Sequence, residues 1–153
     1  MARAPFQIVV FPFRQNENGN YEYAIFKRSD DSYWQGIAGG GEDHETPVEA
    51  AKREAFEEAK IPTSAKYFRL RAMDMVPVYH FPARKLWPKD IYVIPNYCFG
   101  VESSNVDIIL SVEHTAFKWV DCETGRALLH WQGNKTALWE LNERLGRNDL
   151  ILV

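Results

Sequence analysis

Apolar and polar positions along the chain predict strands over much of its length. Residues 5–13 (PFQIVVFPF) are apolar and rich in β-branched and aromatic side chains, and residues 21–28 (YEYAIFKR) alternate between the two classes. The QNENGN segment between them has turn chemistry, so the two segments are predicted to form a β-hairpin, with Pro12 disturbing one edge of its first strand. Four further segments have strand patterns: 33–41, which runs into glycines, 65–81, which is interrupted, 91–102 and 114–121.

A helix is predicted over residues 47–59. Thr46 fits the N-cap and Pro47 fits the first helical position. Glu49 completes a capping box, in which the side chains of Thr46 and Glu49 each accept a backbone N–H group. Pro62 disfavours helical backbone at the residue before it and therefore ends the helix.

A second long helix is predicted near the C-terminus. Asn134 fits an N-cap, and the helix would run to about residue 145 with a buried stripe of Ala137, Leu138, Leu141 and Leu145. A short helix over 123–130 and an exposed loop over 82–90 complete the pattern. The order strands, helix, strands, helix predicts an α/β (α+β) fold, with a mixed sheet between helices, in a single domain over residues 1–153.

Composition and charge narrow the function classes. The net charge is −3, and the short segments FKR and RLR form no basic stripe, which argues against a nucleic-acid polymer as partner. No apolar run reaches membrane-spanning length and the N-terminal MARAPFQIVV lacks the shape of a signal peptide, so we expect a cytoplasmic protein with no membrane partner. Cys98 and Cys122 lack zinc-ligand spacing and are expected to be reduced core residues.

Three glutamates gather on one face of the first predicted helix. With about 100° per residue, Glu54, Glu57 and Glu58 fall within an arc of roughly 100°. Like charges at this spacing repel each other, and either a solvated surface or a bound cation would relieve the repulsion. A core stripe is expected on a different side of the helix: Val48, Ala55, Phe56 and Ala59.

A hard divalent cation suits this cluster, because Mg²⁺ and Mn²⁺ prefer oxygen ligands. The small side chains of Ala50 and Ala51 would leave space above the helix. The glycines at 39–41 would permit unusual backbone angles and the close approach of a main-chain carbonyl or a phosphate.

The acidic residues belong to a longer pattern. It runs Gly39, five residues, Glu45, seven residues, Arg53-Glu54, two residues, Glu57-Glu58, two residues and Ile61. This spacing resembles the Nudix box and favours a metal site over a solvated surface. Lys60 departs from the glycine that the family usually has there. That glycine commonly ends the helix at positive φ, so Lys60 is expected to lose about 1 kcal/mol in the same conformation.

The resemblance implies an α/β/α sandwich around a mixed sheet, and hydrolysis of a nucleoside diphosphate linked to another group. It assigns Glu57 and Glu58 as principal Mg²⁺ or Mn²⁺ ligands and Glu54 as a third ligand or the partner of a metal-bound water. The carbonyl region of Gly39, with Gly40 beside it, would complete the site.

Two further box residues have supporting roles by the same resemblance. Arg53 would pair with Glu45 and with the glutamates, and would hold the loop and the helix in register. Outside the box, Glu113 is the best candidate for the general base or an additional metal ligand, because a loop just before a strand could return it to the helix. An exposed loop acid is the alternative for Glu113, and neighbouring His114 would either contact the substrate or lie on the surface.

Other residues are candidates for binding the rest of the substrate. Trp34 and Gln35 precede the glycines and could form one wall of a base or pterin pocket, although a core role for Trp34 is equally compatible with the sequence. Lys27 and Arg28, at a strand end, could reach phosphates or be solvated. Trp119 and Trp131 are expected in the core.

A second, looser resemblance concerns the substrate. RSDDSYWQGIAGG, VEHTAFKWVD and WQGNKTALWELNERL are similar to segments of the Nudix subgroup that removes pyrophosphate from dihydroneopterin triphosphate and dATP-like triphosphates. We therefore predict a Mg²⁺-dependent pyrophosphohydrolase that releases a monophosphate and pyrophosphate, as a monomer or homodimer. The alternatives are another nucleoside diphosphate-X substrate, such as a sugar nucleotide or dinucleoside polyphosphate, and a non-catalytic nucleotide-binding domain.

Overall fold

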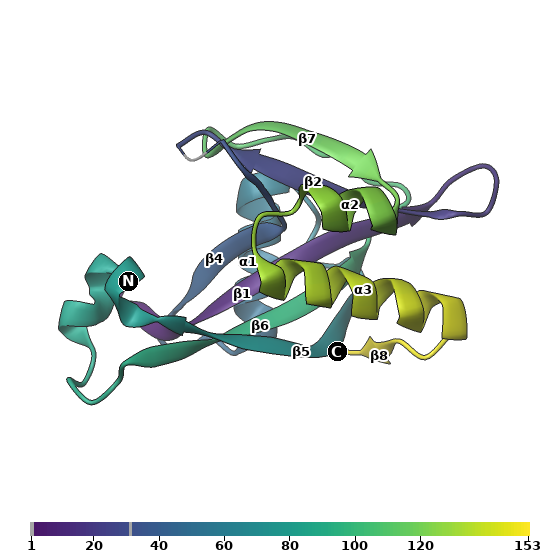
Figure 1. The fold of residues 1–153 in the computed structure, drawn as a ribbon. Helices are drawn as coiled ribbons and strands as arrows, with labels where there is room; N and C mark the ends of the chain where they lie inside the picture. The colour runs from purple at the N-terminus through teal and green to yellow at the C-terminus, as the bar shows by residue number, and fades with distance from the viewer. Residues whose placement is uncertain (1, 31) are drawn as a thin grey trace.

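One long strand, β1 (Arg3–Gln15), organises the sheet in the computed structural model, which describes residues 2–30 and 32–153 (Figure 1). Its first part pairs antiparallel with β4 (Ile37–Glu42), and its last residues pair antiparallel with β2 (Tyr21–Arg28). Along its other edge β1 runs parallel to β6 (Val93–Glu102). Both halves of the sheet are therefore built on β1.

The sheet contains eight strands in the order β3–β2–β1–β6–β5–β8, with β4 paired to β1 and β7 paired to β2. The remaining strands are β3 (Trp34–Gln35), β5 (Tyr67–Pro77), β7 (His114–Val120) and β8 (Ile151–Leu152). The β1–β6 pair is parallel and the other pairs between the named strands are antiparallel, so the predicted mixed sheet is confirmed.

Helices cover both faces of the sheet. In Figure 1, α3 (Gln132–Arg147) crosses in front of the sheet beside α2 (Cys122–Leu128), and α1 (Pro47–Ala59) lies behind it. Successive side chains of β1 point to opposite faces. Ile8 and Val10 pack on the α1 side, and Val9 and Phe11 pack on the α3 side. The predicted α/β/α sandwich is confirmed, with one apolar core in each of its two layers.

Helix α1 has the predicted bounds and the predicted cap. The Thr46 hydroxyl accepts the N–H of Glu49 at 3.3 Å, and the Glu49 carboxylate accepts the N–H of Thr46 at 2.8 Å. Lys60 ends the helix with φ 59° and ψ 31°, the left-handed conformation expected at this position.

The buried face of α1 differs from the expectation. Ala50 and Ala51 are fully buried against the sheet instead of leaving space above the helix, because small side chains let the helix pack closely on the strands. Phe56 is 47% exposed, with the ammonium of Lys60 5.0 Å from its ring centroid, so its predicted place in the core is wrong.

Helix α3 begins two residues earlier than Asn134, so the predicted cap is wrong. Trp131 is the N-cap residue, and Asn134 lies buried in the first turn, where its side-chain oxygen accepts the N–H of Gly36 at 2.9 Å. Gly36 lies between β3, which pairs with β2, and β4, which pairs with β1. Asn134 thus supplies a hydrogen bond where the chain changes partner strands. The predicted stripe is buried at Ala137, Leu138 and Leu141, and Leu145 is half-buried.

Residues 82–90 are largely exposed, as predicted, but they are not simply a loop, because the segment contains a 3₁₀ helix and one buried side chain. The short 3₁₀ helices η1 (Val78–His80) and η2 (Pro82–Leu86) precede Trp87, whose buried indole donates to the carbonyl of Arg3 at 2.7 Å. The Arg3 guanidinium lies 5.3 Å from the ring centroid of Phe81 and 5.7 Å from that of Trp87. Aromatic burial and these cation–π contacts tie the segment to the start of β1.

Two findings concern the predictions of reduced cysteines and of no membrane-spanning segment. Cys98 is buried, Cys122 is half-buried, and both are free thiols. Across residues 2–30 and 32–153, no helix has the length and apolar character needed to cross a membrane.

Replacing Asn134 by Ala should lower the free energy of unfolding by about 1–3 kcal/mol, because the buried N–H of Gly36 loses its acceptor. Urea unfolding of N134A and of the matched exposed-site variant N105A measures the difference. An N134A protein as stable as N105A would show that the Gly36 hydrogen bond contributes nothing to the junction of β3 and β4.

Candidate active site

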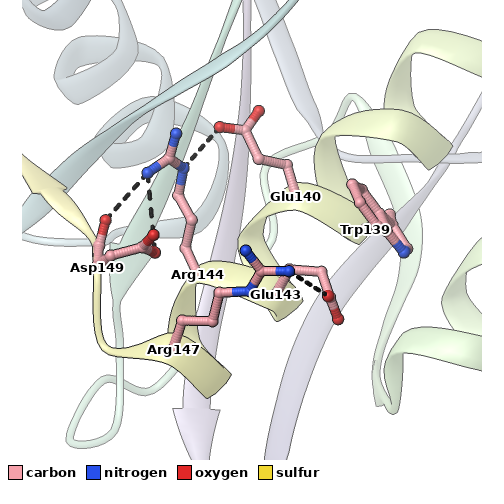
Figure 2. Close-up of a pocket in the computed structure, with 6 residues that line it drawn as sticks. All are labelled: Trp139, Glu140, Glu143, Arg144, Arg147 and Asp149. Carbon is pink, nitrogen blue, oxygen red and sulfur yellow. Dashed lines mark hydrogen bonds and ion pairs between the residues drawn. The ribbon is translucent and has the colours of Figure 1, made fainter.

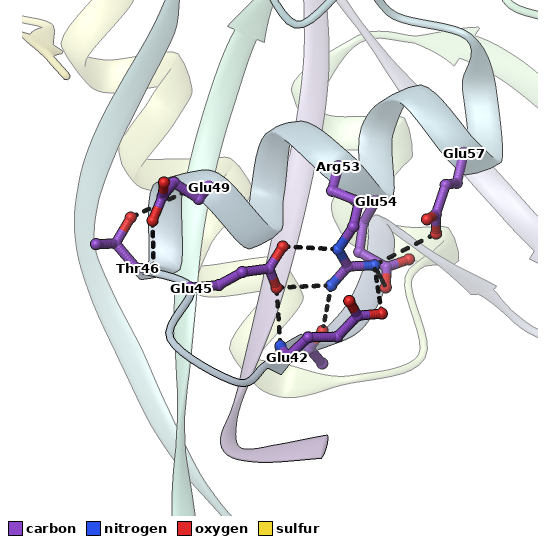
Figure 3. Close-up of polar contacts among 8 residues, drawn as sticks. Glu42, Glu45, Thr46, Glu49, Arg53, Glu54 and Glu57 are labelled. Carbon is purple, nitrogen blue, oxygen red and sulfur yellow. Dashed lines mark hydrogen bonds and ion pairs between the residues drawn. The ribbon is translucent and has the colours of Figure 1, made fainter. Parts of the chain in front are cut away.

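Arg53 is the centre of a polar network on α1 (Figure 3). Its guanidinium donates to both carboxylate oxygens of Glu45, at 2.8 and 2.9 Å, and to the carbonyl of Gly40 at 2.8 Å. Its third nitrogen donates to Glu54 at 2.9 Å and to Glu57 at 3.3 Å. A planar guanidinium with five N–H donors suits such a set of acceptors. The predicted contacts of Arg53 with Glu45 and with helix glutamates are present.

The pair of Arg53 and Glu45 keeps both groups ionised. The hydrogen bond from Arg53 lowers the pKa of Glu45, and the Glu45 carboxylate in turn raises the pKa of Arg53. Glu45 also accepts the backbone N–H of Glu42 at 2.8 Å. The pair therefore fastens the turn between β4 and α1 to the middle of the helix.

Glu58 is the most deeply buried of the three helix glutamates. It is 2% exposed, and neither of its carboxylate oxygens has a hydrogen-bond partner. Burial, together with the neighbouring carboxylates of Glu54 and Glu113, raises the pKa of Glu58 to about 10. Burial also raises the pKa of Glu54. A carboxylate in such a place must either keep its proton or have a cation beside it.

The segment after β6 returns to the C-terminal end of α1. The N–H groups of Ile109 and Ser111 donate to the carbonyls of Ala59 and Glu58, each at 3.1 Å. These bonds satisfy acceptors that the end of a helix leaves free. They also bring Glu113 close to Glu58, which is where the sequence prediction placed it.

His114 is buried beside the same cluster rather than exposed. Its side chain is 0% exposed, and Nδ1 lies 3.9 Å from Oε1 of Glu58. Burial, and next the charge of Arg28, lower the pKa of His114, so the ring is neutral at pH 7. His44, at a variable position of the box, is exposed.

The glycine run is needed for space, not for unusual dihedral angles. Gly39 and Gly40 lie in the extended strand β4. Among the glycines that the structure describes, positive φ occurs at Gly19 and not in this run. A Cβ at Gly39 would overlap the carboxyl group of Glu54, and a Cβ at Gly40 would overlap the guanidinium of Arg3. The strand thus approaches charged side chains on both of its faces, and the expectation of unusual backbone angles is wrong.

The acidic cluster fits a divalent cation in its chemistry. The two unpartnered oxygens of Glu58, beside Glu54 and Glu113, form an oxygen-rich environment of the kind that Mg²⁺ and Mn²⁺ prefer. Among residues 2–30 and 32–153, however, the observed side-chain positions do not bring three or more His, Cys, Asp or Glu residues together in an arrangement that could hold a metal ion. Glu57 is directed to Arg53 instead. The full ligand set of Glu54, Glu57, Glu58, Gly39 and Glu113 therefore stays a prediction.

Comparison with known proteins identifies the family. The model of the NUDIX domain matches residues 6–139, which contain the whole box and most of the sheet. The chain belongs to the Nudix family. It is a Nudix hydrolase, which favours an enzyme over a non-catalytic nucleotide-binding domain. Nudix hydrolases generally use divalent metals.

Three similar proteins show how far the likeness extends. A solved NUDIX hydrolase from Listeria monocytogenes is 41% identical, with 98% of this chain and 100% of that chain covered and a TM-score of 0.88. Dihydroneopterin triphosphate diphosphatase of Escherichia coli K12 is 28% identical over 116 residues, 73% of this chain and 76% of the relative. The NUDIX domain of NrtR from Shewanella oneidensis, solved with ADP-ribose, has a TM-score of 0.69 at 11% identity, with 95% and 90% covered.

The predicted pocket wall of this Nudix hydrolase is only partly open. Gln35 is buried, and its side-chain oxygen accepts the indole N–H of Trp131 at 3.2 Å. Trp34 is half-buried, with the ammonium of Lys118 4.7 Å from its ring centroid. Trp131 is 41% exposed, so its predicted core position is wrong, and Trp119 is half-buried against the core. The indole of Trp131 is therefore more accessible to a stacked ring than the indoles of Trp34 and Trp119.

The two predicted phosphate-binding residues point to opposite faces of the sheet. The hydrogen bond from the guanidinium of Arg28 to Asp30, at 2.8 Å, raises the pKa of Arg28. The charges of Glu113 and Glu58 add to this shift, so Arg28 lies near the acidic cluster. Lys27 shares the opposite face with Ile25, because side chains alternate along β2. Arg28 is thus the one of the pair that lies beside the box.

The sequence analysis did not predict a row of polar side chains on the face of the sheet that α3 covers. Gln7, Asn96 and Asp74 are register neighbours across β1, β6 and β5, and Gly40 of β4 lies next to Gln7 on the other side. The buried Asn96 amide donates to Asp74 at 3.2 Å while its oxygen has no partner, and Asp74 lies against Gly133 at the start of α3. An asparagine within the apolar run IYVIPNYCFGVE was the available signal.

Two surface hollows lie away from the box carboxylates. One, of about 160 Å³, lies at the C-terminal end of α3, where Figure 2 shows Arg144 between Glu140 and Asp149. Arg144 donates to Glu140 at 2.7 Å and to the Asp149 carbonyl at 3.0 Å, so its charge is already compensated. The other, of about 290 Å³, is lined by Thr46, Arg69 and Tyr97 among others. Neither contains the acidic residues of the Nudix box.

Without metal, the protein should lose stability as the pH rises from about 5 to about 9. The raised pKa of Glu58 means that the unfolded chain binds fewer protons than the folded protein in this range, so the free energy of unfolding falls with pH. The E58Q variant should show a flatter dependence. Urea unfolding in EDTA at several pH values gives the difference between the two proteins.

Added Mg²⁺ should restore part of the lost stability of the wild type at high pH and little of it in E58Q, because the cation offsets the charge of Glu58. Parallel pH curves for the two proteins would contradict the buried, proton-holding state of Glu58.

Proposed function

We propose that this Nudix hydrolase is a Mg²⁺-dependent pyrophosphohydrolase that converts a nucleoside triphosphate or dihydroneopterin triphosphate to its monophosphate and pyrophosphate. The observation that carries the proposal is the buried Glu58 of the Nudix helix, whose two carboxylate oxygens have no hydrogen-bond partner and lie near the carboxylates of Glu54 and Glu113. The similarity to dihydroneopterin triphosphate diphosphatase supports this choice of substrate.

Glu54, Glu57 and Glu58 would hold Mg²⁺, or Mn²⁺ in its place, with Glu113 and the carbonyl of Gly39 as further oxygen ligands. A bound cation of this kind offsets phosphate charge and makes coordinated water more acidic. Glu57 would turn from Arg53 toward the cluster, and Arg53 would keep its bonds to Glu45 and Gly40, so the scaffold need not change.

Glu113 is proposed to accept a proton from the attacking water. The water oxygen forms a new bond to phosphorus, the bond to the departing pyrophosphate breaks, and the pyrophosphate oxygen keeps the electron pair. Glu113 is exposed on a turn that is hydrogen-bonded to α1 and to Ser29, the residue after β2, and this position suits a base that must meet water and substrate. Arg28, whose charge interacts with Glu113 and Glu58, is proposed to contact a phosphoryl oxygen.

The heterocycle of the substrate is proposed to bind at the start of α3. Trp131 offers a partly exposed ring beside Gln35, and Trp34 and Lys27 would complete that side. Asp74 and Asn96 on the sheet would accept hydrogen bonds from ring N–H or amino groups, which pterins and purines carry. A single domain over residues 1–153, a monomer or homodimer and a cytoplasmic location remain predictions.

Pyrophosphate release should require Mg²⁺ and should be greatest with dihydroneopterin triphosphate or dATP. The panel includes other nucleoside triphosphates, ADP-ribose and diadenosine polyphosphates, each with Mg²⁺ and with EDTA. Turnover of ADP-ribose or a dinucleotide alone would retain the Nudix reaction and overturn the proposed substrate.

The E57Q variant should lose several orders of magnitude in kcat with its fold intact, because a neutral amide is a poor ligand for a hard cation. E49Q is the matched control, since Glu49 lies on the same helix outside the cluster and glutamine preserves the capping box. Near-normal activity of E57Q would reject the metal assignment.

The E113Q variant should lose less activity than E57Q and should also lose the acidic limb of the pH–rate profile, as expected when a general base is removed. An unchanged profile with reduced Mg²⁺ affinity would instead assign Glu113 to the metal.

A further inference from the structure

Two polar groups without partners face each other beneath the acidic cluster. The imidazole of His114 is fully buried, and neither of its nitrogens has a hydrogen-bond partner. Both carboxylate oxygens of Glu58 are buried and unpartnered as well, and one lies 3.9 Å from Nδ1 of His114. Buried donors and acceptors are nearly always satisfied in folded proteins, so a pair of unsatisfied groups at this distance calls for an explanation.

The position of the His114 ring is set by its surroundings. The ring packs on Phe26 with centroids 5.5 Å apart, and the backbone of His114 is held in β7 by pairing with Arg28 of β2. The 3.9 Å separation is about 1 Å too long for a hydrogen bond. The Glu58 side chain, at the end of a longer and more flexible stem, is the group that can move to close it.

The other charged groups near the ring supply no free donor to Glu58. Arg28 is engaged with Asp30, and the neighbouring Glu113, when ionised, accepts hydrogen bonds and cannot donate one. A neutral imidazole carries one N–H donor, and placing that donor on Nδ1 directs it at Glu58.

We propose that His114 is a positioning residue for the metal site. When a divalent cation binds, its Nδ1–H donates to one carboxylate oxygen of Glu58 and leaves the other oxygen for the cation. The inference rests on the proposed function only in assigning Glu58 to the metal. Partners that orient a metal ligand in this way typically change metal affinity 10–100-fold when removed.

Mn²⁺ binding to the full chain without substrate, followed by calorimetry, tests the proposal. H114L, which keeps an apolar side chain of similar bulk, should bind Mn²⁺ about tenfold or more weakly. H114N should bind within about threefold of the wild type, because the asparagine amide places a donor close to the position of Nδ1. H130N is the matched control, since His130 is exposed and stacks on Tyr33, and it should leave the affinity unchanged.

A purely packing role for His114 predicts another order. H114L would then bind Mn²⁺ at least as tightly as H114N, and that result would overturn the proposal. Circular dichroism and urea unfolding of each variant confirm that folded proteins are compared. If H114L fails to fold, H114N decides alone: affinity within about threefold of the wild type supports the donor, and a tenfold loss overturns it.

The E58Q variant separates failure of this inference from failure of the proposed function. If E58Q binds Mn²⁺ as tightly as the wild type, Glu58 is not a ligand and both proposals are overturned. If E58Q weakens binding and H114L does not, only the role of His114 is overturned. The double variant should bind no more weakly than E58Q alone, because both changes remove the same contact.

Discussion

The burial of the Glu58 carboxylate is the constraint on which the acidic end of the molecule depends. A charge cannot remain there without compensation, and the side chains around it add negative charge instead of relieving it. The neighbouring structure is arranged to keep this carboxylate in place. The turn at residues 109–113 closes the end of α1, His114 fills the space beneath, and Arg53 holds the preceding loop against the helix. The Glu58 carboxylate therefore keeps its proton unless a cation lies beside it.

Arg53 and Glu58 have complementary roles in that arrangement. Arg53 is saturated with acceptors and forms a scaffold that can lose its contact to Glu57 and still bind Glu45 and Gly40. Glu58 is unsaturated and gains a partner only when something binds. The proposed metal site would benefit from this difference, because a cation could bind to Glu58 while the contacts of Arg53 with Glu45 and Gly40 stay unchanged.

The sheet separates two groups of polar side chains, which the proposed function assigns to the metal and to the heterocycle of the substrate. Because side chains alternate along β4, Gly39 approaches Glu54 on the α1 side and Gly40 approaches Arg3 on the α3 side. The polar row of Gln7, Asn96 and Asp74 continues from Gly40 across the α3 face. A substrate that reaches around the edge of β4 can therefore place phosphates at one face and its heterocycle at the other.

The fold and the local geometry of the box could be predicted from the sequence, because both depend on short-range spacing. The capping box, the left-handed Lys60, the mixed sheet and the contacts of Arg53 with Glu45 follow from periodicity, from steric rules or from the recognised motif. Contacts between residues that are far apart in sequence, and that the folded sheet brings together, could not be predicted in this way. Asparagine is common at helix N-caps, so the sequence predicts a cap at Asn134, yet its side-chain oxygen accepts the N–H of Gly36, 98 residues away in sequence.

The sequence by itself determined which residues carry the acidic chemistry and which elements present them. Only the tertiary structure decided which of those acids is buried, that His114 lies beside it, and that Glu57 is held by Arg53. Helical spacing ranks Glu54, Glu57 and Glu58 as neighbours on one face, but it contains no information on what packs over that face. The turn that closes over Glu58 comes from more than 50 residues further along the chain. Solvation, and with it the pKa of a carboxylate, depends on such distant neighbours and not on the spacing of the residues that bear the charge.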